Sequence, residues 1–247
     1  MPRQQRLVEP GIYHVVNRGV EQRNIYLDAA DYEFFLDLLL TVIEKHSIVV
    51  HAFCLMTNHY HLLLETKEHN LSKVMQHLND KYSKYFNKKY KRVGPLWQGR
   101  FKSLPLYDEV HFWMVSKYIE RNPIKAGMVA VIDTYQYQSF FQWNNKGKYY
   151  KLLDDSTIFN MRLDEYTDYI STDFEIDAID IVYDSPKVII KDNKLKVLSK
   201  RLETFFELDK DINRDQNIKK AYSYGYTKSE IAKFLELNPS TVLRVVS

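Results

Sequence analysis

The sequence predicts an α+β domain built on a four-stranded antiparallel sheet, followed by an acidic stretch and a helical C-terminal domain. Short runs of β-forming residues alternate with long stretches of helical periodicity as far as Arg121. Residues 154–184 hold ten acids and one base, and helical periodicity returns at Lys194. We therefore expect three segments: residues 1–150, 151–193 and 194–247.

The first elements follow from local patterns. Residues 11–18 are rich in β-formers and lead into the turn-forming Gly19, which predicts a strand. Residues 28–45 carry apolar side chains at helical spacing, and Asp28 is a suitable cap. Two further strands are expected at residues 47–56 and 59–65, with a tight connection between them.

The remaining elements of this domain complete a known arrangement. A helix is expected from Leu71 to about Tyr90, then a strand at residues 98–106 and a helix at residues 107–121 that ends at Asn122-Pro123. The resulting order, β-α-β-β-α-β plus one extra helix, is the split βαβ or ferredoxin-like arrangement. It places an antiparallel sheet beneath helices on one face.

The C-terminal domain has the pattern of a DNA-binding helix-turn-helix. Helices are expected from Lys194 and at about residues 214–224, and the capping box formed by Thr227 and Glu230 opens a third. A turn and a last short helix follow. Its outward side chains able to reach a DNA groove would be Ser240, Thr241 and Arg244. Between the two domains, the acidic segment 151–193 is either a wrap over the first domain or a flexible linker.

Composition limits the class of protein. The 247 residues are 45% hydrophobic and 27% charged, as in ordinary globular proteins. No apolar run approaches the roughly 20 residues of a membrane helix, so we expect no membrane segment. The single cysteine, Cys54, excludes an internal disulfide and suits a cytoplasmic protein. Residues 1–150 hold 20 Lys and Arg against 14 Asp and Glu, so positive charge collects in the first domain.

A basic stretch interleaved with aromatic residues lies between Lys81 and Lys102. It contains eight basic residues and no acid. Such a stretch either binds single-stranded nucleic acid, with cations on phosphates and rings on bases, or forms a solvated helix face whose rings lie in the core. The candidate DNA-contacting residues in this domain are Arg18, Lys81, Lys84, Lys88, Trp97, Arg100 and Lys102.

The candidate active site begins with His59 and His61 on the third strand. Residues i and i+2 of a strand share a face, so the two imidazoles lie together while Tyr60 points the other way. Imidazole is a common ligand of divalent metals, although a histidine pair on a strand is often only structural. A third ligand is needed, and we expect the side-chain oxygen of Asn122 to supply it. His14 could approach the site from the first strand.

Tyr118 lies four residues before Asn122 and therefore shares its helix face. If this helix crosses the sheet over the histidines, the phenol lies about one turn from the metal. A tyrosine nucleophile would form a phosphotyrosine ester that keeps the energy of the broken DNA bond, which implies breaking and joining. The alternative is structural, because the chain has 19 tyrosines and an asparagine before a proline is a usual helix end.

These motifs together resemble a known family. The residues His59-Tyr60-His61, the run from Tyr118 to Gly127 (YIERNPIKAG), the opening YHVVNRG at Tyr13 and the run WQGRFKS at Trp97 are similar to those of the HUH single-tyrosine transposases, above all the REP-associated tyrosine transposases. The resemblance spans about residues 11–129. Tyr60 replaces a usual hydrophobe, and Asn122 stands where other single-tyrosine transposases have glutamine.

The resemblance implies nicking of single-stranded DNA beside a hairpin, through a 5′-phosphotyrosine on Tyr118 and a free 3′-OH. Mg²⁺ or Mn²⁺ would be the cofactor, hairpin DNA the partner, a homodimer is compatible with the family, and the protein would work in the cytoplasm at the nucleoid. Two other hypotheses remain open at this point. One is a non-catalytic DNA-binding regulator that uses the helix-turn-helix, and the other is an unrelated metallohydrolase that uses His59 and His61.

Overall fold

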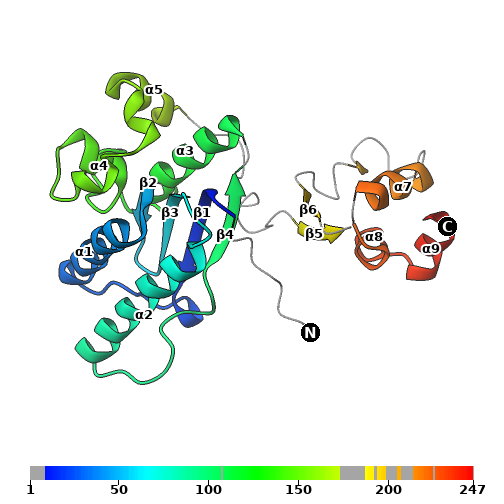
Figure 1. The fold of residues 1–247 in the computed structure, drawn as a ribbon, viewed down its shortest axis with the longest axis horizontal. Coiled ribbons are helices and arrows are strands. Elements are labelled where there is room, and N and C mark those ends of the chain that lie inside the picture. Colours follow the sequence, from blue (N-terminus) through cyan, green and yellow to red (C-terminus); the bar gives the residue numbers. More distant parts are fainter. Residues whose placement is uncertain are drawn as a thin grey trace. The chain divides into compact units, whose positions relative to one another are not determined.

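The computed structural model describes residues 9–106, 108–172, 187–191, 194–198, 205–206, 214–224 and 226–246 (Figure 1). The chain splits into two compact units, Met1–Ala178 and Ile179–Ser247, which are described separately below. Among the described helices, none is both long and apolar enough to cross a membrane.

The first unit is organised around a four-stranded antiparallel sheet, as predicted. Its strands are β1 (Gly11–Arg18), β2 (Ile48–Leu55), β3 (His59–Thr66) and β4 (Lys102–Leu106), in the order β2-β3-β1-β4. Every neighbouring pair is antiparallel. This is the sheet order of a split βαβ arrangement, in which β1 and β3 become the central strands. The fourth strand begins at Lys102 and not at Gln98, since Gly99 interrupts the extended run.

Two helices, α1 (Ala29–His46) and α2 (Leu71–Lys89), cover one face of this sheet (Figure 1). The first begins at a capping box between Asp28 and Asp31, which satisfies its free backbone amides. A short 3-10 turn, η1 (Val20–Gln22), precedes it. Alternate residues of the central strands point to this face and form the main apolar core with both helices: Tyr13, Val15, Tyr60, Leu62 and Leu64.

Helix α3 (Glu109–Lys125) packs on the opposite face of the sheet, against β2, β3 and β4 (Figure 1). The predicted end at Asn122-Pro123 is wrong, because the helix continues through Pro123. A proline this close to a helix end removes only one backbone donor. Other hydrogen bonds stabilise the last turn of the helix. Gly127, at φ +65°, donates to the Ile124 carbonyl, and Met128 donates to the Pro123 carbonyl at 2.9 Å, which is a Schellman motif.

The compact unit extends beyond the predicted boundary at residue 150. Helix α4 (Ser139–Asn144), the 3-10 turns η2 (Tyr150–Leu153) and η3 (Thr157–Asn160), and helix α5 (Leu163–Ser171) follow α3. Tyr166 and Ile170 of α5 are buried. The Arg121 guanidinium of α3 donates to the carbonyl oxygens of Ile170 and Ser171, both at 3.0 Å. Of the two alternatives for the acidic segment, the part up to Thr172 therefore packs against the first unit.

The first described elements of the second unit form a hairpin, β5 (Lys187–Lys191) and β6 (Lys194–Leu198). A helix was predicted from Lys194, and this is wrong for residues 194–198. Lysine and apolar residues alternate from Lys194 to Val197, and that period-two pattern favours a strand. The part of the predicted helix that lies at residues 199–204 and 207–208 falls outside the described residues.

Among the described residues after the hairpin, the helices are α7 (Arg214–Tyr224), α8 (Lys228–Phe234) and α9 (Pro239–Val246). The predicted capping box of Thr227 and Glu230 is present at the start of α8. Glu236, between α8 and α9, has φ +55°, a left-handed conformation for which glycine is the usual residue. The core of this unit consists of Phe206, Ile218, Ala221, Ile231, Ala232 and Val242.

Candidate active site

The two histidines of β3 point away from the main core, toward α3. His59 is half-buried and His61 is 1% exposed. Tyr60, between them, points to the other face, as predicted, where it is fully buried and its hydroxyl donates to Asn79 Oδ1 at 2.9 Å. The strand therefore separates a packed tyrosine from a pair of imidazoles whose rings lie 5.0 Å apart.

A third imidazole, that of His14, completes the cluster. Val16 of β1 lies directly opposite His61, so His14, two residues earlier, occupies the diagonal position on the same face. His14 is 1% exposed, and its Nε2 lies 3.0 Å from Nδ1 of His61. The sequence indicated His14 only as a hypothesis, because its place depends on which strands are neighbours.

The cluster is held in its neutral form by burial. Desolvation lowers the pKa of His14 to about 3. Desolvation, with a smaller contribution from the Arg18 charge, lowers the pKa of His59 to about 4. The pKa of His61 is well below its usual value, first because of burial and then because His59 and His14 are close. Neutral imidazoles carry the lone pairs that metal ions require.

Tyr118 reaches this cluster from α3, although it lies 57 residues after His61 in the chain (118 − 61). Its ring meets that of His61 edge-on at 5.4 Å between centroids, and that of His14 at 6.0 Å. The side chain is 8% exposed. The spatial meeting of a helix phenol with strand imidazoles, on which the predicted chemistry depends, is thus present.

Asn122 lies one turn further along α3 and is also 8% exposed. Its amide Nδ2 donates to the Tyr118 backbone carbonyl at 2.9 Å. This hydrogen bond fixes the orientation of the amide and leaves Oδ1 as its only atom able to bind a metal. The same bond couples the position of Asn122 to the turn that carries Tyr118.

Two predicted phosphate contacts lie near the cluster. Arg18 is directly opposite His59 in the sheet, and its Nε donates to Gln98 Oε1 at 3.0 Å. Lys102 of β4 is opposite Val16, which in turn is opposite His61, so all three residues share the α3 face. Arg100 is exposed in the segment before β4. Positive charge is therefore available beside the buried imidazoles.

The donor set fits a divalent metal ion. His59 Nδ1 lies 2.6 Å from Asn58 Oδ1, which leaves its Nε2 for another ligand. His61 Nε2 is buried and has no hydrogen-bond partner, which is the condition expected of a metal-binding nitrogen before the metal binds. Across the described residues, no three or more His, Cys, Asp or Glu side chains are arranged to hold a metal, so a metal here would need a donor of another kind beside the histidines.

The region that contains this site matches a family model. The model described as "Transposase IS200 like" covers residues 8–122. Residues 8–122 form an IS200-like transposase domain. The match includes β1, β3, Tyr118 and Asn122, which are the elements and residues of the candidate site.

The IS200-like transposase domain also has structural relatives. A REP-associated tyrosine transposase solved with a REP hairpin is 18% identical, with a TM-score of 0.51 over 60% of this chain and 87% of that chain. This likeness establishes a shared fold. A transposase-like protein from Deinococcus radiodurans is 20% identical over 49% of this chain and 97% of that one, with a TM-score of 0.35, too low to establish a shared fold. A comparison with curated proteins found no match.

The other predicted DNA contacts of the transposase domain lie elsewhere. Lys81, Lys84 and Lys88 are exposed on α2. The rings between them turn inward, since Tyr82 and Phe86 are buried. Trp97 is half-buried, and its indole nitrogen donates to the Asn79 carbonyl at 3.2 Å. The rings of this stretch therefore belong to the core, and contact of its lysines with DNA stays a prediction.

The three predicted contacts of the second unit lie on α9. Ser240 and Arg244 are exposed, and Thr241 is half-buried. The Ser240 hydroxyl donates to Asn238 Oδ1 at 2.8 Å, which orders the start of the helix. Their contact with a DNA groove stays a prediction. Sequence reasoning also missed four residues that join Lys81 and Lys84 around a groove, which the spacing of α2 could have indicated: Lys45, His46, Lys73 and His77.

Proposed function

We propose that the IS200-like transposase domain nicks and rejoins single-stranded DNA beside hairpin-forming sequences, with Tyr118 as the nucleophile. The observation that carries this proposal is the approach of the Tyr118 ring to within 5.4 Å of the His61 ring, from an element distant in the chain. Attack by a tyrosine keeps the energy of the broken phosphodiester bond in a protein-linked ester, whereas attack by water would lose it.

In the proposed step, the phenolic oxygen of Tyr118 attacks phosphorus. A bond forms between this oxygen and phosphorus, and the bond from phosphorus to the 3′ oxygen breaks. The phenol loses its proton, and the leaving oxygen gains one to become a free 3′-OH. The 5′ phosphate stays on Tyr118, and attack by another 3′-OH reverses the step and joins two strands without an external energy source.

His59, His61 and Asn122 are the residues that would hold the cofactor. When Mg²⁺ or Mn²⁺ is bound there, it withdraws negative charge from a phosphate oxygen. His14 supports this role through its contact with His61. If His61 Nδ1–H donates to His14 Nε2, then His61 Nε2 keeps its lone pair for the ion. Arg18 and Lys102 supply charge that can bind the flanking phosphates.

The test uses labelled single-stranded hairpin DNA from the sequences that flank the gene, incubated with the full chain in Mn²⁺. We expect a covalent adduct that survives denaturing electrophoresis and is lost completely in Tyr118→Phe. Tyr150→Phe is the matched control, since this half-buried tyrosine lies outside the site, and it should retain the adduct. Absence of an adduct with every hairpin of a library contradicts the proposal, and turnover of small phosphoesters without an adduct favours a metallohydrolase.

The second candidate function is a non-catalytic DNA-binding regulator. It is favoured by α8 and α9, which pack through Ile231 and Val242 while Ser240 and Arg244 remain exposed. In that case, Arg244→Ala should remove the cellular effect and Tyr118→Phe should leave it intact. The reverse result supports strand transfer.

A further inference from the structure

The two histidines of β3 differ in what their Nδ1 atoms contact. His61 Nδ1 faces another imidazole, that of His14, at 3.0 Å, and either ring can donate in this pair. His59 Nδ1 lies 2.6 Å from an amide oxygen, Asn58 Oδ1. A neutral imidazole carries one proton, and a metal ion binds only the nitrogen without it. The contact at Nδ1 therefore decides whether Nε2 of His59 is open to a metal.

The orientation of the Asn58 amide follows from its other hydrogen bond. Its Nδ2 donates to the backbone carbonyl of Gln22 at 3.0 Å. A carbonyl oxygen only accepts hydrogen bonds, so the NH₂ group must face Gln22 and Oδ1 must face His59. Because Oδ1 also only accepts, the proton of His59 lies on Nδ1. Its Nε2 therefore has a free lone pair before any metal binds.

The Gln22 carbonyl belongs to the turn that follows β1, residues 19–23. Glu21 and Gln22 have φ values of +56° and +58°, in the left-handed region that residues other than glycine rarely adopt. The Gln22 amide donates to the Gly19 carbonyl at 3.0 Å, which closes the turn. A turn with two successive left-handed residues is strained and persists only where its contacts hold it. The position of the Gln22 carbonyl is therefore set by the contacts of this turn.

The same turn also holds the backbone of Asn58. The Gly19 amide donates to the Asn58 carbonyl at 2.9 Å, and the Ile25 amide, just after the turn, donates to the Thr57 carbonyl at 2.9 Å. A side chain at position 19 would not fit, because its Cβ would lie 2.3 Å from the Arg23 carbonyl oxygen. One short segment thus holds Asn58 through both its main chain and its side chain.

We propose that Asn58 is a positioning residue that fixes the proton of His59 on Nδ1, and that the turn at residues 19–23 holds Asn58 in the orientation this requires. His59 is then prepared for a metal before the metal binds, whereas the proton on His61 depends on its imidazole partner. The value of this arrangement to a metal site rests on the proposed function. The position of the His59 proton does not, and it can be measured without metal or DNA.

The test begins with nitrogen-15 NMR spectra of the metal-free full chain, which show which ring nitrogen of each histidine carries the proton. The His59 signals are assigned by their loss in His59→Gln. Wild-type protein should carry the His59 proton on Nδ1. Asn58→Ala should populate both forms, and Asn58→Asp, whose carboxylate still accepts, should keep the proton on Nδ1. A wild-type proton on Nε2, or an unchanged proton in Asn58→Ala, overturns the proposal.

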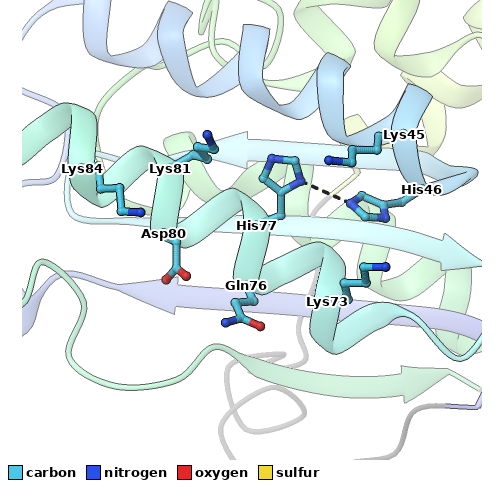
Figure 2. A pocket seen from close by; sticks show the side chains of 8 residues that line it. All are labelled: Lys45, His46, Lys73, Gln76, His77, Asp80, Lys81 and Lys84. Atoms are coloured by element: carbon cyan, nitrogen blue, oxygen red, sulfur yellow. Dashed lines mark hydrogen bonds between the residues drawn. The ribbon is translucent and has the colours of Figure 1, made fainter.

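Asn70→Ala is the matched control. The Asn70 Nδ2 also donates to a backbone carbonyl, that of His46, at 2.9 Å. His46 Nε2 lies 3.2 Å from His77 Nδ1, in the groove between α1 and α2 on the face of the sheet opposite α3 (Figure 2). In this variant the His59 proton should stay on Nδ1. The same shift in Asn58→Ala and Asn70→Ala would reflect a general loosening of the fold and would overturn the specific role of Asn58.

A second pair of variants tests the turn. Gly19→Ala changes neither Asn58 nor His59, and it should release the His59 proton as Asn58→Ala does. Gly99→Ala is its control, since a Cβ there meets no described atom within 4 Å, and it should keep the proton on Nδ1. A folded Gly19→Ala protein with the His59 proton still on Nδ1 overturns the role of the turn. If Gly19→Ala does not fold, the Asn58 variants still decide the assignment.

Titration calorimetry with Mn²⁺ then connects this proton to the metal site. Asn58→Ala should bind Mn²⁺ about tenfold more weakly, as is typical when the partner of a metal-ligating histidine is lost, whereas Asn58→Asp and Asn70→Ala should not weaken binding. Unchanged Mn²⁺ affinity in a variant whose His59 proton has moved would show that His59 does not bind the metal. That result contradicts the metal site of the proposed function and leaves the role of Asn58 in place, so the two failures are distinct.

Discussion

The two faces of strand β3 differ in how their polar groups are satisfied. Toward α1 and α2, the Tyr60 hydroxyl donates to Asn79 and the ring packs against Phe35 and Trp97. Toward α3, the buried ring nitrogens His61 Nε2 and His14 Nδ1 have no hydrogen-bond partner. Unpaired buried polar atoms reduce stability, so two such nitrogens within one cluster indicate that these imidazoles are placed to bind a ligand, whereas the paired Tyr60 on the other face serves folding.

The largest effect expected from this difference concerns His14. His14→Ala removes the partner of His61 Nδ1, and we expect Mn²⁺ to bind about 10- to 100-fold more weakly, as is typical when a residue that orients a metal ligand is lost. Titration calorimetry without DNA measures this directly. His14→Gln, which can still hydrogen-bond to His61, should recover much of the affinity. Unchanged Mn²⁺ binding in His14→Ala would show that the contact is only packing.

A second expected effect concerns Glu120, a buried carboxyl on the α3 side. Burial raises its pKa to about 8, against hydrogen bonds from Ser139 and the Phe140 amide that lower it. The folded state thus binds more protons than the unfolded chain between about pH 4.5 and 8, and stability falls as pH rises through this window. We expect Glu120→Gln to be more stable at pH 8 by on the order of 2 kcal/mol, with no gain at pH 4.5.

Denaturant unfolding of both proteins at several pH values measures this difference. Glu109→Gln, at the exposed start of α3, is the control and should not alter the pH dependence. A wild-type protein whose stability is level between pH 5 and 8 would contradict the raised pKa.

The smallest expected effect is on the apolar face. Tyr60→Phe leaves Asn79 Oδ1 without its donor, and we expect a loss of about 1 kcal/mol in the free energy of unfolding. Adduct formation by Tyr118 should stay within twofold of wild type, because Tyr60 points away from the cluster. A large loss of activity at unchanged stability would mean that the two faces are not independent.

Local patterns in the sequence were sufficient to predict most helices and strands of the first unit. Strand β1 begins and ends as predicted, and α1 begins at Ala29, directly after the predicted cap Asp28. Strand alternation also predicted that His59 and His61 share one face of the sheet, and their rings lie 5.0 Å apart. The contact between His14 and His61 could not, because it depends on β1 and β3 being neighbours in the sheet.

Other features required the folded structure for different reasons. The segment from Lys194 has both helical and alternating character. It forms a strand because it pairs with residues 187–191. Interleaved lysines and tyrosines of α2 looked like one surface for single-stranded DNA, but 3.6 residues per turn sends Tyr82 to the core and Lys81 outward. Composition alone does not tell which side chains of α2 share a face.

The tie between α3 and α5 has a practical consequence for anyone who shortens this protein. The Arg121 guanidinium, next to Asn122, is anchored by carbonyl oxygens of Ile170 and Ser171, which lie well beyond the family match that ends at residue 122. A fragment that ends at residue 150 would therefore lose the two hydrogen bonds that hold Arg121, three residues after Tyr118 on α3. A minimal enzyme should run at least to Thr172.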